Sequence, residues 1–153
     1  MRVDLDVTIA RPVADVFAYL TDVTKVPEWQ ESAQSGEWID LRKRYRERRT
    51  FLGRSAELEL EVTAWEDDRR FDVRTVKSPV KLEIHHALEA VGGGTRLHVT
   101  ADAALGGAMR FAAGMAKKQA ERQFRGDLDR LKEILEKRGE ESPSDRPPRP
   151  VVG

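Results

Sequence analysis

Cysteine is absent from the 153-residue sequence. The absence excludes disulfide bridges, thiolate nucleophiles and metal sites with thiolate ligands. Long hydrophobic runs are also missing: nowhere do about eighteen apolar residues follow one another, so we expect no membrane span. The N-terminal stretch MRVDLDVTIARP carries acidic residues where a signal peptide needs an unbroken apolar run. We therefore expect a cytoplasmic protein.

An excess of charge of either sign is missing as well. The chain has 27 Lys and Arg side chains against 27 Asp and Glu side chains. Such a chain has no overall field that would attract nucleic acid or an anionic surface, and we expect no nucleic-acid partner. A net charge near zero also removes one barrier to self-association, so a monomer and a homodimer both remain open.

The first thirty residues predict a strand followed by two short helices. Apolar residues alternate with polar ones from Val3 to Ile9, which is the period of a half-buried strand. Pro12 ends that strand and suits the first turn of a helix. The helix continues to Leu20 with apolar residues at helical spacing, and a second helical turn is expected over residues 24–29.

Residues 36–102 return to a period of two. Strands are expected over residues 38–41, 45–52, 56–65, 71–75, 82–88 and 97–101. The links between them are short and rich in Asp, Gly, Ser and Pro. Consecutive strands with short links form antiparallel pairs, so the pattern predicts a meander.

From residue 105 the period changes to that of a helix. Apolar residues step by three or four up to residue 138, which predicts a helix about 50 Å long at 1.5 Å per residue. Its first half, residues 105–116, is apolar nearly all round, whereas the second has one apolar stripe. Gly114 and Gly126 weaken a helix; a close approach to backbone or ligand, or simple flexibility, would explain them. We expect one domain over residues 1–138 and a disordered Pro-rich, charged tail over residues 139–153.

Four stretches of the sequence resemble the START-like superfamily, also called SRPBCC, and within it the bacterial polyketide cyclase/dehydrase-like proteins. They are VTIARPVADVFAYLTDVTKVPEW at 7–29, LELEVTAWEDDRRFDVRTV at 58–76, GGGTRLHVTADAALGG at 92–107 and FRGDLDRLKEILE at 124–136. The resemblance implies an α+β helix-grip fold. In it a bent seven-stranded antiparallel sheet wraps a long C-terminal helix, with two short helices after the first strand and a hydrophobic cavity between sheet and helix. The superfamily includes lipid carriers, hormone receptors and polyketide aromatases and cyclases, and it implies no shared catalytic set.

Three residues are candidates for chemistry in such a cavity. By alternation His86 shares a face with apolar neighbours, so it points inward and could orient a ligand carbonyl or transfer protons. Glu47 and Arg49 share a face with Tyr45 and Phe51, where they could anchor a polar ligand group. Two alternatives stay open: a structural histidine that bonds to a neighbouring strand, and a strand near the sheet edge whose charges reach solvent. His85 and His98 fall on the other face, so we expect no metal site and no cofactor.

The inward faces of the strands and the apolar half of the helix supply the predicted ligand contacts. Ordinary core packing is the competing explanation for these side chains. The candidates are Trp29, Tyr45, Phe51, Leu60, Phe71, Ile84, His86, Met109, Phe111 and Met115.

A basic run over residues 42–49 invites an interaction with nucleic acid or a membrane surface. The acidic side chains Glu57, Glu59 and Glu61 on the next strand offer cross-strand partners, which would explain the run without any external ligand. We favour the second explanation.

Three functions are compatible with this pattern. The first is binding of a small hydrophobic or aromatic metabolite or lipid in the cavity. The second is a polyketide cyclase or aromatase acting on a bound polyketide-like chain, in which the cavity orients the substrate. The third is a non-catalytic protein-interaction module. We favour binding of a small hydrophobic molecule, and whether any reaction is catalysed stays open.

Overall fold

A computed structural model of the chain describes residues 1–51, 53–78, 80–104 and 113–141. Strand β1 (Arg2–Ile9) is followed by helix α1 (Val13–Leu20), the 3-10 turn η1 (Val23–Lys25) and helix α2 (Val26–Trp29). The strands that follow are β2 (Ala33–Asp40), β3 (Arg44–Phe51), β4 (Arg54–Glu66), β5 (Arg70–Lys77), β6 (Lys81–Val91) and β7 (Gly94–Ala104). Helix α3 (Ala113–Glu141) comes last.

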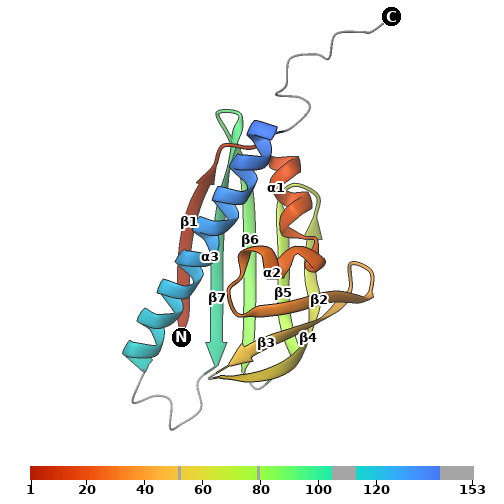
Figure 1. Ribbon diagram of the computed structural model, residues 1–153, viewed down its shortest axis with the longest axis vertical. Coiled ribbons are helices and arrows are strands. Elements are labelled where there is room, and N and C mark those ends of the chain that lie inside the picture. The colour runs from red at the N-terminus through yellow and green to blue at the C-terminus, as the bar shows by residue number, and fades with distance from the viewer. Residues whose placement is uncertain (52, 79, 105–112, 142–153) are drawn as a thin grey trace, which may run out of the picture.

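The seven strands form one antiparallel sheet in the order β1-β7-β6-β5-β4-β3-β2. Consecutive strands from β2 to β7 are neighbours, as the short links predict, and β1 forms one edge of the sheet by pairing with β7. Figure 1 shows the sheet strongly bent, with β2 and β3 crossing below the short helices while α3 lies over β1 and β7. The predicted helix-grip fold is confirmed.

The core lies between the concave face of the sheet and the helices. On α3 the apolar stripe holds Leu128, Leu131 and Leu135, each at most 2% exposed. They pack in one cluster with residues of β1 and β7 such as Ile9 and Leu97, both fully buried. The spacing of three and four residues places all three leucines on one side of the helix, and this side packs against the sheet.

Most strand boundaries lie one to three residues from the predicted ones, and the boundaries of β2 and α3 show the differences that matter most. Strand β2 begins at Ala33, five residues before the predicted start, because pairing with β3 recruits residues 33–36, which carry no alternating apolar pattern. Helix α3 extends to Glu141, so residues 139–141 are helical and not part of a disordered tail. Residues 105–112, predicted to open the helix, lie outside the described residues, as do residues 142–153.

Gly36 differs from the helical glycines Gly114 and Gly126 in the space available for a side chain. A Cβ atom on Gly36 would lie 2.1 Å from the carbonyl oxygen of Val23, so β2 approaches η1 too closely for any side chain there. A Cβ atom added to Gly114 or Gly126 would have no heavy atom within 4 Å apart from the adjacent backbone of the helix itself. Neither helical glycine therefore permits a close approach of the backbone. No described helix combines the length and the apolar character that a membrane crossing needs.

Candidate functional site

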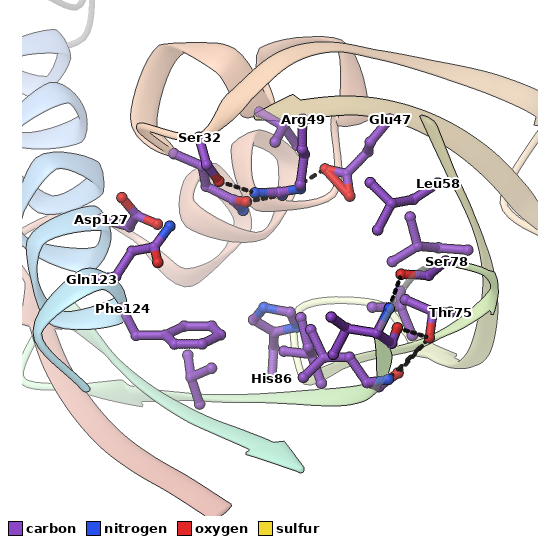
Figure 2. Close-up of a pocket in the computed structure, with 18 of the residues that line it drawn as sticks. Ser32, Glu47, Arg49, Leu58, Thr75, Ser78, His86, Gln123, Phe124 and Asp127 are labelled. Atoms are coloured by element: carbon purple, nitrogen blue, oxygen red, sulfur yellow. Dashed lines mark hydrogen bonds and ion pairs between the residues drawn. The ribbon is translucent and has the colours of Figure 1, made fainter. Parts of the chain in front are cut away.

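A cavity of about 260 Å³ lies between the concave face of the sheet, the segment around α2, and α3. Figure 2 shows side chains converging on it from β3, from the inner strands and from the helix. Most of the wall is apolar. Its larger apolar side chains are Leu20, Val23, Val26, Trp29, Leu58, Leu60, Phe71, Val73, Val80, Leu82, Ile84, Val99, Phe124 and Leu128.

One wall of the cavity carries a buried ion pair from β3. Alternation along this strand turns Tyr45, Glu47 and Arg49 toward the cavity, and Glu47 is only 3% exposed. Arg49 Nη2 donates to Glu47 Oε2 at 2.7 Å. The guanidinium also donates from Nη1 to Ser32 Oγ at 2.8 Å and from Nη2 to Gln30 Oε1. These bonds hold the guanidinium in one orientation at the cavity wall, and the carboxylate of Glu47 does not reach solvent.

The inner face of β3 also carries a buried phenol. Tyr45 is 5% exposed, and burial, with a further effect of the Glu47 carboxylate, raises the pKa of its hydroxyl well above the ordinary value. The phenol therefore stays protonated at neutral pH and can donate a hydrogen bond.

On α2, the indole Nε1 of Trp29 is buried and has no hydrogen-bond partner among the described residues.

His86 lies on the opposite side of the cavity from the Glu47–Arg49 pair (Figure 2). Its Nδ1 is 2.8 Å from the carbonyl oxygen of Phe71, and the two rings stack with centroids 5.6 Å apart. Burial lowers the pKa of His86 to about 4, so the ring is neutral at neutral pH. A carbonyl oxygen only accepts hydrogen bonds, so Nδ1 carries the proton and Nε2 is left as an acceptor. The inward orientation agrees with the sequence prediction.

The other two histidines belong to the convex face. His85 contacts Asp72 with 2.9 Å between Nδ1 and Oδ2, and His98 lies between Asp4 and Asp6. In the part of the chain that the structure describes, no group of three His, Asp or Glu side chains is arranged to hold a metal ion.

Helix α3 closes the cavity with residues that the sequence analysis did not single out. Gln123, Phe124 and Asp127 line it, and Figure 2 shows all three pointing inward from the helix. Asp127 Oδ1 accepts a hydrogen bond from the backbone N–H of Glu31 at 3.2 Å, and burial raises the pKa of this carboxyl group. Steps of four residues back from Leu131 reach Asp127 and then Gln123, and one such step back from Leu128 reaches Phe124, so the spacing of the apolar stripe would have found this face, because residues three and four apart are neighbours on a helix.

Most of the described ligand-contact candidates line the cavity. Six of the ten do so: Trp29, Tyr45, Leu60, Phe71, Ile84 and His86. Met115 does not, since it is 79% exposed. Ala120, which lines the cavity, is five positions further along the helix, and that spacing rotates Met115 about 140° away from the lining side. The side chain of Phe51 and all of Met109 and Phe111 lie outside what the structure describes.

Solved structures with the same fold confirm the architecture. The aromatase/cyclase ZhuI from Streptomyces sp. R1128 has a TM-score of 0.76 at 18% identity, covering 91% of this chain and 95% of its own. TTHA0849 from Thermus thermophilus has a TM-score of 0.76 at 17% identity, with 88% and 97% covered. A START superfamily protein from Mycobacterium smegmatis has a TM-score of 0.67 at 18% identity, with 92% and 97% covered.

At the level of sequence, no curated protein matches the chain. The profile of one protein family does match, over residues 1–136, which is nearly all of the described structure. It includes the strands, the short helices and most of α3, and so every described element that lines the cavity. The chain belongs to the polyketide cyclase/dehydrase and lipid transport family.

Proposed function

We propose that this protein binds a small, uncharged, largely aromatic molecule that carries hydroxyl or carbonyl groups. The observation that carries the proposal is a mostly apolar cavity of about 260 Å³ with polar side chains on opposite walls. Ligand sites in proteins are typically mostly apolar with a few polar groups that fix orientation. The volume is below the usual range of roughly 300–1,000 Å³ for drug-sized ligands, which favours a compact ligand.

The charges around the cavity argue for a neutral ligand. Arg49 is the one Lys or Arg side chain among the described lining residues, and Glu47 already pairs with it. Asp127 on α3 adds a second carboxyl group to the cavity lining. A ligand carboxylate would therefore meet no surplus positive side chain, and burying an unpaired charge is costly. Hydroxyl groups can instead donate to Nε2 of His86 and accept from the phenol of Tyr45.

A matched series of two-ring compounds tests this proposal. We expect 2-naphthol to bind more tightly than naphthalene, and 2-naphthoate to bind least, in calorimetric titrations at neutral pH. Leu82→Trp should fill part of the cavity and weaken binding of 2-naphthol, whereas Val91→Ser, at the remote end of β6, should leave it unchanged. Tightest binding by the carboxylate, or equal binding by the Leu82→Trp variant, would contradict the proposal.

A second candidate function is folding and cyclisation of a bound polyketide-like chain. The observation that favours it is the placement of two proton-transfer groups on different walls: neutral His86 on the sheet and Asp127 on α3. With a pKa of about 4, His86 is a weak base, so its main contribution is orientation of the substrate by hydrogen bonding. Holding a flexible chain in a reactive conformation accelerates cyclisation by proximity. The fold relative ZhuI, described as an aromatase/cyclase, supports this candidate by analogy alone.

A product analysis separates the two candidates. A reactive poly-β-ketone thioester would be incubated with the protein, and cyclised products would be measured by mass spectrometry. For an enzyme, we expect a product distribution that differs from the spontaneous one and that His86→Gln and Asp127→Asn return to it. An unchanged distribution with the wild-type protein would leave binding as the function.

A further inference from the structure

The turn between β2 and β3 exposes apolar side chains at its tip. Leu41 is 67% exposed and Ile39 is 44% exposed, although both are large aliphatic residues. Figure 1 shows this turn projecting from the side of the molecule remote from α3. Residues 39–44 are called the hairpin tip below. Its apolar side chains do not line the cavity.

The backbone of the hairpin tip is held in a costly conformation. The N–H of Lys43 donates to the carbonyl oxygen of Asp40 at 2.9 Å, which makes Leu41 and Arg42 the central residues of a tight turn. Arg42 has a φ of 63°, a region that residues with a Cβ atom rarely adopt. Its guanidinium lies 4.9 Å from the ring centroid of Trp65, a cation–π contact that ties the tip to the sheet. This turn keeps Leu41 at the apex.

The cations beside the apex are only partly neutralised by the protein. The sequence predicted that the acidic side chains of β4 would pair with these cations. Among the outward-facing arginines of β3, however, only Arg46 forms ion pairs, with Glu37 at 2.9 Å and Glu57 at 2.8 Å. The other two acidic side chains of that face of β4 turn to β5: Glu59 contacts Lys77 and Glu61 contacts Arg74. Within the described ranges no carboxylate lies at ion-pair distance from Lys43, Arg44 or Arg48.

We infer that the hairpin tip docks the protein on an anionic lipid surface, with Leu41 and Ile39 entering the interface and Lys43 and Arg44 contacting headgroups. Exposed aliphatic side chains beside uncompensated cations match the two properties of such a surface, an apolar interior and a negative boundary. A nucleic acid would use the cations and gain little from an exposed leucine. The inference does not depend on what the cavity binds.

Co-sedimentation with vesicles tests the inference on the full-length protein. We expect binding to vesicles of phosphatidylcholine and phosphatidylglycerol, little binding to phosphatidylcholine alone, and weakening by salt because exposed charges are screened. Leu41→Ser should weaken binding roughly tenfold or more, from the cost of exposing a leucine side chain. The double variant Lys43→Ala with Arg44→Ala should weaken it roughly thirtyfold, because each of the two cations contributes separately to the attraction by the anionic headgroups.

Two matched controls make the outcome decisive. Val91→Ser removes a 37% exposed valine outside the hairpin tip, and Lys137→Ala removes an exposed cation of α3 that pairs with Glu133; both should bind vesicles like the wild type. Equal thermal unfolding temperatures of all variants would show that the fold is intact. Failure of the wild-type protein to bind anionic vesicles overturns the inference. Vesicle binding that Leu41→Ser leaves unchanged also overturns it. Heparin binding with the same dependence on salt and on the variants would overturn it too, because the cations would then bind a soluble polyanion.

Discussion

Phe71 holds His86 in two ways at once: its carbonyl oxygen accepts a hydrogen bond from Nδ1 at 2.8 Å, and its ring stacks on the imidazole at an interplanar angle of 26°. The two residues are directly paired across β5 and β6. Because strand register sets both contacts, the tautomer and the orientation of His86 are fixed before any ligand enters. The cavity therefore presents a preorganised acceptor, which lowers the entropic cost of binding a hydroxyl group.

Burial of His86 should make stability depend on pH. Its pKa is about 4 in the folded protein and about 6.5 when unfolded. Between those values the unfolded chain binds more protons, so the free energy of unfolding should fall as pH is lowered from 6.5 to 4, by up to roughly 3 kcal/mol. Above pH 6.5 this contribution is fully present and constant. Urea unfolding of the wild type and of His86→Gln at pH 7 and pH 4 isolates it, and identical losses in both proteins would contradict the assignment.

The Glu47–Arg49 pair should show strong coupling in a double-variant cycle. Arg49→Met leaves Glu47 buried without its cation, and we expect a loss of roughly 2–4 kcal/mol in the free energy of unfolding. Combining it with Glu47→Leu removes the stranded charge and should recover most of that loss. The comparison is made by urea unfolding at pH 7. Additive losses in the double variant would mean that the two side chains do not depend on each other.

Gly36 and Gly126 should respond oppositely to alanine. In Gly36→Ala the new Cβ meets the backbone carbonyl of Val23, so β2 must separate from η1; we expect a loss of several kcal/mol or no folding. In Gly126→Ala the methyl group enters open space on α3, and the higher helix propensity of alanine should raise stability by about 1 kcal/mol. Thermal unfolding measures both. A destabilised Gly126→Ala variant would show that this glycine has a role beyond the helix backbone.

The stripe of α3 should carry most of the contribution of that helix to stability. Leu131 is fully buried, and Leu131→Ala should cost roughly 2–5 kcal/mol through lost burial and the resulting cavity. Met115, 79% exposed on the same helix, provides the control: Met115→Ala should change the free energy of unfolding by less than about 0.5 kcal/mol. Comparable losses in the two variants would contradict the packing described for α3.

Alternation along single strands predicted much of the candidate site. It placed His86 and the Glu47–Arg49 pair on the inner face, because side chains of a strand point to opposite faces in turn. Helical periodicity did not predict Asp127 or Gln123, which are polar residues beside the apolar stripe of α3. It also misplaced Met115, because a helix segment that is apolar on all sides gives no direction.

The local pattern of residues determined the order of strands and helices, the antiparallel meander and the side of each strand that is buried. These properties depend on periods of two and 3.6 residues, which are visible within a few turns of the chain. The tertiary structure alone decided which walls face each other across the cavity. The carbonyl oxygen of Phe71 reaches the ring of His86 once β5 and β6 pair in register, whereas Asp127 reaches the backbone of Glu31 only after segments far apart in the chain have packed. Burial then shifts the pKa values of His86 and Asp127 in opposite directions, because it disfavours the charged form of each group.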